Sequence, residues 1–530
     1  MHALPKHVGL FVLIGALTVS VGAFGPTAAS GAPDPQVSGS EVRATTSQLA
    51  VDRPSTAAAP KMSAEQSSEM ALRHVVRREQ VAAALAPVPA NPAAKPVPRG
   101  TETVQAAESD VLRIGRNNRN TRATAVSNTL AEPAAANEGT SVFYTGNTYA
   151  SASTNGGSTW SAVALPAGPA DASIACCDLD VVRAHSRDRI FSSLLYTNAA
   201  QTNGVVRISV RNSPTSAPLC TYTIDPGGTA NNLLPDYPHL GLSNGFLYLS
   251  LNNITGGTWS GAQIRRFNLT QMSACQSATF NTVNWTGTVG QRILTPVEGA
   301  TTVMYFGSNQ TSTSFRAFSW PESSTVMTSV LRTVGASNFT NPDCRGGTGN
   351  FDFIERSTAW SIGGFRLRGA TGGGQVTFWW PTAADANHPQ AHLHGATLRT
   401  SDLALIAQPP VWNGSTCFGY PAVASNVFGE YGMSAAVGGR AGGGGSAAQG
   451  IVLVDDGQSA GIFFPSYTVT ATGTHNRSDG RYGDYFTVRT NSRCTSAWVA
   501  TNFALLNGNT TSAHVNARYV EMQSSLDPAC

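Results

Sequence analysis

The stretch STNGGSTW occupies residues 153–160, with small turn-forming residues in its middle and a tryptophan at its end. Asn and Ser side chains hydrogen-bond to the backbone of turns, and Gly supplies the positive φ angles that tight turns require. A turn specified this closely beside a large aromatic residue indicates a hairpin held in a fixed position against a core. The rest of the chain decides which core that is.

The chain around this turn carries few charges and many turn residues. Of its 530 residues, 12% are charged, against about 25% in an average soluble protein, and 53 are glycines. A net charge of +3 creates no field that favours a nucleic acid or an anionic membrane as partner. We therefore expect no nucleic-acid partner.

The N-terminus has the pattern of an export signal. Lys6 and His7 precede an apolar run at residues 8–24, and the small residues PTAASGA follow it. This order is typical of a secretory signal peptide over residues 1–32, cleaved near Ala29 or Ala32. A membrane anchor is the alternative, but the run is short and no second apolar span follows. We expect a secreted, extracellular protein with no membrane span in the mature chain.

Residues 33–108 form a region rich in Ala, Pro and Ser with almost no aromatic residues. Such a composition cannot bury a core and predicts a mostly disordered leader or pro-segment. One short helix is expected at residues 63–86, where Ser63 and Gln66 fit a capping box.

Short strand-like runs separated by Gly, Asn and Ser turns fill the chain from about residue 125 onward. A weak repeat recurs along them, and each copy contains the expected inner and second strands of one sheet. Its anchors are Pro133, Leu179, Pro238, Pro296, Phe353, Pro421 and Phe486, spaced 46 to 68 residues apart. Seven such units predict an all-β, seven-bladed β-propeller of four-stranded antiparallel blades over residues 109–530. A six-bladed ring with an accessory hairpin is the alternative.

A propeller must also close its ring. Unless the last blade is completed by another strand, it leaves an exposed sheet edge. We therefore expect a strand within residues 110–126 to pair with the last blade.

The opening stretch resembles a known motif. Ser153, Asn155, Gly157 and Trp160 match the Asp-box S-x-D-x-G-x-T-W of sialidase-like propellers, with Asn in place of Asp. ITGGTW at residues 254–259 resembles a degraded second copy. Segments such as CCDLDVV, FSWPESST, YPAVASN and RYGDYFTVR are similar to secreted bacterial Asp-box (BNR-repeat) propellers of the sialidase superfamily. That resemblance implies the fold and secretion but no single activity, and it places the motif on the perimeter, away from the catalytic face.

A true sialidase is disfavoured. Sialidases hold the substrate carboxylate with three arginines, the first in an F-R-I-P motif, and use a Tyr nucleophile with a Glu and an Asp acid. Here only LRIG at residues 112–115 is similar, so Arg113 is the one candidate of this kind. Alternatively, Arg113 is a surface residue of the ring-closing strand.

The first residues of the inner strands are expected to surround one mouth of the central channel. Carboxylates, tyrosines and an arginine there suit sugar hydroxyls or a uronate. The catalytic candidates are His239, Tyr237, Asp236, Asp178, Asp484 and Tyr485, and the substrate-binding candidates are Arg345, Asp352, Tyr420, Glu132 and Arg113. In a polysaccharide lyase, His239 would be the general base and Tyr237 the acid. Alternatively, Asp236 and Asp484 cap turns while the tyrosines pack between blades.

The stretch NHPQAHLHG contains His388, His392 and His394, the last two on one face of a strand. These two could be metal ligands or a lyase base, but we expect no carboxylate nearby in sequence to complete a metal site and therefore expect chance histidines. The sequence predicts neither a metal site nor a cofactor.

Eight cysteines follow the signal, and an oxidising compartment favours disulfides. No C-x-x-C pair has partners at the spacing of a zinc site. Pairing within or between adjacent blades gives Cys220–Cys275, Cys344–Cys417 and Cys494–Cys530, which leaves Cys176 and Cys177 to each other. An adjacent pair beside Asp178 would offer a flat surface for stacking on a sugar. Alternatively, the two side chains point to opposite faces of a strand and pair with distant cysteines.

Two classes of function fit this reading. The first is a carbohydrate-active enzyme, a glycoside hydrolase or polysaccharide lyase acting on extracellular glycan of uronic or sialic type. The second is a non-catalytic glycan- or protein-binding or adhesion module, because propellers host both. The expected partner is a glycan or glycoconjugate and the expected state a monomer, while the sequence leaves open whether the protein is an enzyme.

Overall fold

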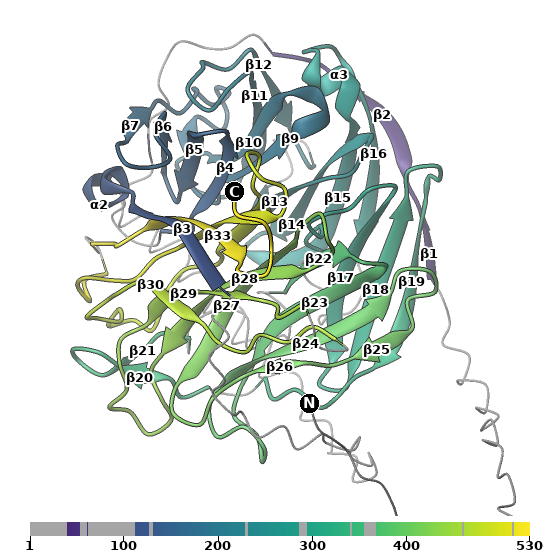
Figure 1. The fold of residues 1–530 in the computed structure, drawn as a ribbon. Helices are drawn as coiled ribbons and strands as arrows, with labels where there is room; N and C mark the ends of the chain where they lie inside the picture. Colours follow the sequence, from purple (N-terminus) through teal and green to yellow (C-terminus); the bar gives the residue numbers. More distant parts are fainter. Residues whose placement is uncertain are drawn as a thin grey trace, which may run out of the picture. The chain divides into compact units, whose positions relative to one another are not determined.

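Seven antiparallel sheets follow one another around a ring, as the computed structural model shows (Figure 1). The structure describes residues 40–52, 61, 112–126, 131–227, 232–285, 294–339, 342–354, 367–457, 461–510 and 514–530. The predicted signal peptide and the predicted helix at residues 63–86 lie outside these residues.

The first three blades are built in chain order. Blade 1 contains β4 (Ala134–Glu138), β5 (Ser141–Gly146), β6 (Tyr149–Ser153) and β7 (Ser161–Val163). Blade 2 contains β8 (Ile174–Ala175) and β9 (Asp180–Ala184), which both pair with β10 (Arg189–Thr197), then β11 (Gly204–Arg211) and β12 (Cys220–Ile224); a 3-10 turn (His185–Arg187) joins β9 to β10. Blade 3 contains β13 (Leu233–Leu242), β14 (Phe246–Thr255), β15 (Thr258–Asn268) and β16 (Ala278–Trp285), with α3 (Leu269–Ser273) before β16.

The remaining blades complete the ring. Blade 4 contains β17 (Val303–Thr311), β18 (Ser314–Pro321) and β19 (Val326–Thr333), and a small sheet of β20 (Arg345–Gly346) and β21 (Phe351–Asp352) follows it. Blade 5 contains β22 (Arg368–Gly372), β23 (Gln375–Thr382), β24 (His392–Arg399), β25 (Leu405–Ala407) and β26 (Pro410–Val411). Blade 6 contains β27 (Cys417–Ser425), β28 (Tyr431–Gly438), β29 (Gln449–Val454) and β30 (Thr468–Ala471). Blade 7 contains β31 (Thr487–Thr490), β32 (Ala497–Asn502) and β33 (Arg518–Ser524).

The predicted seven-bladed propeller is confirmed, and the six-bladed alternative is excluded. Inner strands contact those of neighbouring blades around the ring, as in the pairs β4·β9, β9·β13, β22·β27, β27·β31 and β31·β4. Neighbouring blades therefore cover both faces of the central strands, and every residue of β27 and β28 is buried. Large rings fill the space between blades, since Trp320, Trp379, Trp380 and Trp498 are fully buried.

The prediction for the fifth repeat was wrong. Phe353 was expected to anchor the inner strand of blade 5, but the inner strand of that blade is β22, which begins at Arg368. Phe353 instead follows the small β20–β21 sheet and is buried in the core. The sequence around it resembles an inner strand because it also contains aromatic residues. Most of the expected second strand of this repeat lies outside the described residues.

The ring closes as predicted. β3 (Leu112–Arg119) pairs antiparallel with β33, from Leu112 opposite Ser524 to Arg119 opposite Arg518, and forms the outermost strand of blade 7. The short helix α2 (Thr121–Val126) then leads the chain to blade 1.

The turn at residues 153–160 joins β6 to β7 and lies against this closing strand. Asn155 Oδ1 accepts the Thr159 N–H at 2.9 Å, and Ser153 Oγ accepts the Gly157 N–H at 2.9 Å. Gly157 has φ +82°, and a Cβ on it would lie 2.9 Å from the Trp160 ring, so glycine is required there. Trp160 packs edge-on against Tyr144 of blade 1 and Tyr519 of blade 7.

ITGGTW is not a copy of this turn. Ile254 pairs with Trp259 and Thr255 with Thr258, so Gly256 and Gly257 form a two-residue hairpin turn. That hairpin joins the second and third strands of blade 3, whereas the turn at residues 153–160 joins the third and fourth strands of blade 1.

Part of the predicted disordered leader is ordered. β1 (Ser40–Arg43) adds an outer strand to blade 4 by pairing with β19, and β2 (Thr45–Leu49) pairs with β16 of blade 3. Asp52 then bridges to Thr221 of blade 2, where its carboxylate accepts the Thr223 hydroxyl at 2.6 Å. We call residues 40–52 the belt, since they cross the outer edges of blades 4, 3 and 2 (purple in Figure 1). Main-chain hydrogen bonding to open edge strands orders this segment although it buries little apolar surface.

The four predicted disulfides, Cys176–Cys177, Cys220–Cys275, Cys344–Cys417 and Cys494–Cys530, are present. The stacking role expected for the adjacent pair is wrong, because Cys176 is 0% and Cys177 4% exposed within a hydrophobic cluster of blades 2 and 3. No helix in the described part of the chain is both long enough and apolar enough to cross a membrane.

Candidate functional site

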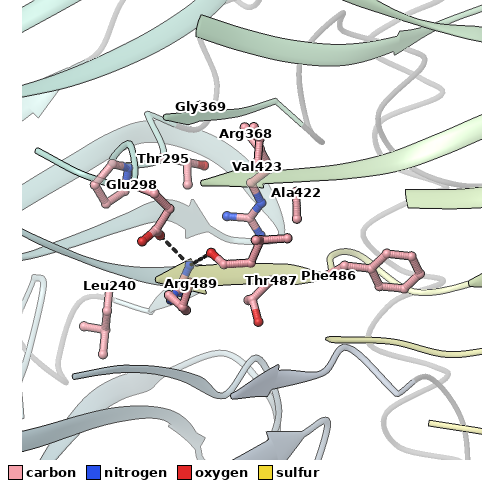
Figure 2. A pocket seen from close by; sticks show the side chains of 12 residues that line it. Leu240, Thr295, Glu298, Arg368, Gly369, Ala422, Val423, Phe486, Thr487 and Arg489 are labelled. Carbon is pink, nitrogen blue, oxygen red and sulfur yellow. Dashed lines mark hydrogen bonds and ion pairs between the residues drawn. The ribbon is translucent and has the colours of Figure 1, made fainter. Parts of the chain in front are cut away.

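The inner strands of blades 3, 5, 6 and 7 and the segment before β17 of blade 4 surround a pocket at the centre of the ring. The pocket is narrow: the space between its atoms is about 280 Å³ only when the open solvent at its mouth is counted, and Figure 2 shows the side chains around it. The lining residues are Leu240, Thr295, Pro296, Glu298, Arg368, Gly369, Ala422, Val423, Phe486, Thr487, Val488 and Arg489. Three of them carry charge, and Figure 2 shows Glu298, Arg368 and Arg489 directed toward the same space.

Arg489 of β31 links two carboxylates from other blades. Its Nη2 donates to Asp180 Oδ1 at 2.8 Å, its Nη1 donates to Glu298 Oε1, and its Nε donates to the Val181 carbonyl at 3.3 Å. All three nitrogens of the guanidinium are therefore engaged, and both carboxylates raise the pKa of Arg489 against the effect of burial. Arg489 thus holds Asp180 and Glu298 in fixed positions.

The two carboxylates titrate differently because their surroundings differ. Burial raises the pKa of Glu298 to about 7, although Arg489 beside it acts in the opposite direction. Burial also disfavours the charge on Asp180, but Arg489, His239 and the Leu240 N–H together hold its pKa well below the usual range. The site therefore contains one ionised carboxylate and one that exchanges its proton near neutral pH, an arrangement suited to acid–base chemistry.

His239 continues the network on the other side of Asp180. Its Nδ1 lies 3.4 Å from Asp180 Oδ2, and its Nε2 lies 3.0 Å from Arg368 Nη2. Because arginine only donates, Nε2 accepts and the proton is on Nδ1. Residues of blades 5, 3, 2, 7 and 4 thus form one chain, Arg368–His239–Asp180–Arg489–Glu298.

This placement argues against the predicted role of His239 as a substrate-contacting base. The residue is 1% exposed, both ring nitrogens are engaged, and burial lowers its pKa to about 3. A buried imidazole of this kind positions Arg368 and Asp180 but does not reach a substrate proton.

Four predicted carboxylates gather at the starts of the inner strands. Glu132 interacts with Asp484 and Asp178, and Asp178 interacts with Asp236 as well. Burial, reinforced by these like charges, raises the pKa of Asp178 to about 8 and that of Glu132 well above its usual value. Glu132 and Asp178 are 2% and 6% exposed, so at these two residues the predicted open mouth is closed by a packed layer of side chains.

The two predicted tyrosines belong to the same layer. Tyr237 and Tyr485 are each 2% exposed, and their rings pack edge-on against each other and against His239. The Tyr485 hydroxyl donates to the Leu179 carbonyl at 2.9 Å, and burial raises the pKa of this phenol well above its usual value. The guanidinium of Arg368 lies 5.3 Å from the Tyr485 ring centroid, so these rings support the pocket arginine.

Strained backbone marks the start of the inner strand in several blades. Glu132, Asp178, Tyr237 and Tyr420 all have positive φ, between 41° and 57°, and each precedes one of the repeat anchors. Side chains other than glycine rarely adopt this conformation, and it persists only where surrounding packing enforces it. The residue just before the anchor therefore has the same backbone conformation in blades 1, 2, 3 and 6.

The other predicted binding residues lie elsewhere. Arg345 is exposed in the small β20–β21 sheet and pairs with Asp343 at 2.6 Å, while the Asp352 carboxylate accepts the N–H groups of Cys344 and Ile354. Tyr420 is buried among aromatic rings, and its hydroxyl donates to the Phe353 carbonyl at 3.0 Å. Arg113 is exposed on β3, the outermost strand of blade 7. The structure therefore does not bring these four side chains to the pocket.

Sequence reasoning missed the residues that line the pocket. Glu298 and Arg489 follow the anchors Pro296 and Phe486 by two and three positions, whereas most of the predicted candidates precede an anchor. The available signal was the single charged residue shortly after the anchor in PVEG (296–299) and FTVR (486–489). No such signal marked Arg368, because the inner strand of blade 5 was predicted around Phe353 and not at β22.

The expectation that no carboxylate accompanies the histidines of blade 5 was also wrong. Asp385 lies three positions before His388, and its carboxylate approaches both His388 and His392. His394 lies apart, stacked on Trp380.

Fold and site together define this chain as a seven-bladed β-propeller with a charged axial pocket. No family model and no curated protein matches it. Among solved structures it is similar to an α-L-arabinofuranosidase of Fusarium graminearum, with a TM-score of 0.40 and 8% identity over 74% of this chain and 92% of that one. It is also similar to an α-L-arabinanase of Penicillium chrysogenum, with a TM-score of 0.37 and 9% identity over 76% and 95%. The NanB sialidase of Streptococcus pneumoniae has a TM-score of 0.36 and 10% identity over 75% and 68%. Similarity of this degree carries no inference about activity.

Proposed function

We propose that this chain is a secreted propeller that binds and processes an acidic sugar of an extracellular glycan in the axial pocket. The supporting observation is the convergence of Arg368, Arg489 and Glu298 on one space, with a pKa of about 7 for Glu298. The export-type N-terminus and four disulfides support secretion.

The proposed roles of the two arginines follow from the charges that already pair with each of them. Arg489 is neutralised by the ionised Asp180 and also donates to Glu298, so it orients Glu298 rather than binding a substrate anion. Arg368 donates a hydrogen bond to the ring of His239. Because this ring is neutral, the contact does not neutralise the positive charge of Arg368. Arg368 is therefore the group that attracts the carboxylate of a uronate.

Glu298 is the proposed proton donor. Its side chain is 19% exposed, against 1% for Asp180, so it is the carboxyl group that a substrate can reach. With a pKa of about 7 it still carries its proton in much of the population at neutral pH, as a general acid for a glycosidic oxygen requires. Its neighbour Asp180 stays ionised and keeps Arg489 in place.

A second candidate function is binding without turnover. The observation that favours it is the internal pairing of the network, in which Asp180 is buried behind Arg489 and cannot act as a second catalytic carboxylate. A propeller with this pocket would then hold an acidic glycan as an adhesion or recognition module.

One experiment separates the two. Wild-type protein, E298Q and R113M are incubated with uronate-containing polysaccharides and with neutral arabinan, and reducing ends and the absorbance of unsaturated products are followed. The proposal predicts turnover of a uronate polymer by wild type and R113M and its loss in E298Q. Binding of the same polysaccharides is measured in parallel by calorimetric titration. Binding without turnover in all three proteins supports the second candidate, and the absence of both binding and turnover contradicts both candidates.

A further inference from the structure

A cluster of two histidines and an aspartate lies in blade 5, outside the axial pocket. Asp385 and His388 belong to the loop between β23 and β24, and His392 is the first residue of β24. One ligand atom from each of the three lies within 4.8 Å of the others. In the described part of the chain, no other group of three such side chains brings its ligand atoms so close.

The distances match those of a small metal centre. His388 Nδ1 lies 3.0 Å from both Asp385 carboxylate oxygens, and His392 Nε2 lies 3.8 Å from Asp385 Oδ2. Ligand atoms about 2.0–2.1 Å from a tetrahedral Zn²⁺ are about 3.3 Å apart. These two separations lie on either side of that value, and all three ligand atoms lie within 4.8 Å of one another, so an ion between them requires only side-chain adjustment.

The protonation of His392 also fits a ligand. Its Nδ1 lies 3.3 Å from the Gln390 carbonyl, which can only accept, so this nitrogen carries a proton. With its proton on Nδ1, the neutral imidazole presents the Nε2 lone pair on the side of Asp385. A backbone carbonyl that fixes the far nitrogen is the usual support of a metal-bound histidine.

The loop itself is held in shape by Asp385. Its Oδ1 accepts the N–H groups of Asn387 and His388 at 2.7 and 2.8 Å, which turns His388 back over His392. The two imidazole centroids lie 4.0 Å apart as a result. Because an Asp385 side chain that is 29% exposed borders the cluster, an ion can enter from solvent.

We infer that Asp385, His388 and His392 form a binding site for a first-row divalent metal ion, with Zn²⁺ as the probe. Two imidazoles and one carboxylate are ligands that Zn²⁺ accepts readily and that Ca²⁺ or Mg²⁺ does not favour. Three protein ligands leave one tetrahedral position for water. The loop between second and third strands lies at the end of the blade where inner strands begin, so this ion would lie on the face of the predicted channel mouth.

The test is Zn²⁺ binding by the untagged full-length secreted chain after treatment with a chelator. Calorimetric titration should show one equivalent bound, and Zn²⁺ should raise the melting temperature. The variants H388A and D385N should each weaken binding by at least tenfold, since each removes a ligand. D385N keeps an acceptor for the loop N–H groups, so its fold is expected to survive, and circular dichroism checks this. H514A, which alters an exposed histidine elsewhere, is the matched control and should bind as wild type.

Cobalt gives an independent readout. Co²⁺ bound by wild type and H514A should show visible ligand-field bands that H388A and D385N lack. Absence of Zn²⁺ binding by wild type, or equal binding by all four proteins, would overturn the proposal and leave the cluster an aspartate–histidine ion pair.

Discussion

The indole N–H of Trp160 donates to the main-chain carbonyl of Arg119 at 3.1 Å, which joins blade 1 to the strand that closes the ring. The same turn receives two more bonds from that strand, from Asn118 Nδ2 to the Gly156 carbonyl at 2.7 Å and from Arg116 Nη1 to the Asn155 carbonyl at 3.3 Å. The turn at residues 153–160 therefore secures the seam of the propeller. Its sequence is tightly specified because it must fit this strand as well as its own blade.

Removal of β3 should destabilise the whole ring. A chain that begins at Thr129 lacks the belt, β3 and the short helix α2, and it leaves the β33 edge and the Trp160 indole unpaired. A chain that begins at Ser109 lacks the belt and the bridge from Lys61 to Ala175 but keeps β3 and α2, and it is the matched control. We expect the chain from Thr129 to melt well below the chain from Ser109, which should itself melt below the mature protein. Equal melting of the two shortened chains would contradict the role of β3.

Loss of the Asn155 side chain should weaken the same seam. Its Oδ1 accepts the Thr159 N–H and the Ser153 hydroxyl, both at 2.9 Å, so N155A leaves two donors without their acceptor. Urea denaturation should show a loss of about 1 kcal/mol in the free energy of unfolding. N155D keeps the acceptor oxygens and should retain most of the stability; a loss as large as that of N155A would show that the acceptor is not what matters.

The adjacent disulfide can be checked by peptide mapping without reduction. A peptide that contains both Cys176 and Cys177 should be two hydrogen atoms lighter than its reduced form and should carry no partner peptide. A linkage from either cysteine to Cys220 or Cys275 would contradict the pairing.

The sequence predicted the fold more fully than the site. Blade number, ring closure and disulfides followed from the spacing of apolar repeats, because these features bury apolar surface or close an edge. The belt was missed because four of the five β2 side chains are exposed, so main-chain pairing orders a segment that shows no apolar pattern. Arg368 was missed for a similar reason, since β22 has the sequence RGATG and offers small residues rather than an apolar strand.

Only part of the residue set expected at the strand starts gathers, and most of that part is buried. Glu132, Asp178, Tyr237 and Tyr485 form a packed layer rather than an open mouth, because neighbouring inner strands bring their side chains into contact across the axis. The position at which the central channel opens depends on this packing between blades. The sequence of any single strand does not determine it.

The stability of the protein should depend on pH through Glu298. Its pKa is about 7 when folded against an ordinary value of 4.5, so between these pH values the folded state keeps a proton that the unfolded state releases. The resulting stabilisation is complete below pH 4.5 and is lost as the pH rises through 7. E298Q cannot titrate, so wild type should lose about 3 kcal/mol relative to E298Q over this range. Parallel pH profiles of unfolding free energy for the two proteins would contradict the raised pKa.

We propose that Arg368 captures the carboxylate of an acidic sugar at the axis of the propeller. The most direct test of this proposal is calorimetric titration of a uronate oligosaccharide into wild type, R368M and R113M, with a neutral arabino-oligosaccharide as the second ligand. We expect wild type and R113M to bind the uronate alike, R368M to bind it at least tenfold more weakly, and the neutral ligand to bind weakly to all three. Equal affinity of R368M and wild type for the uronate, or no uronate binding at all, would contradict the account.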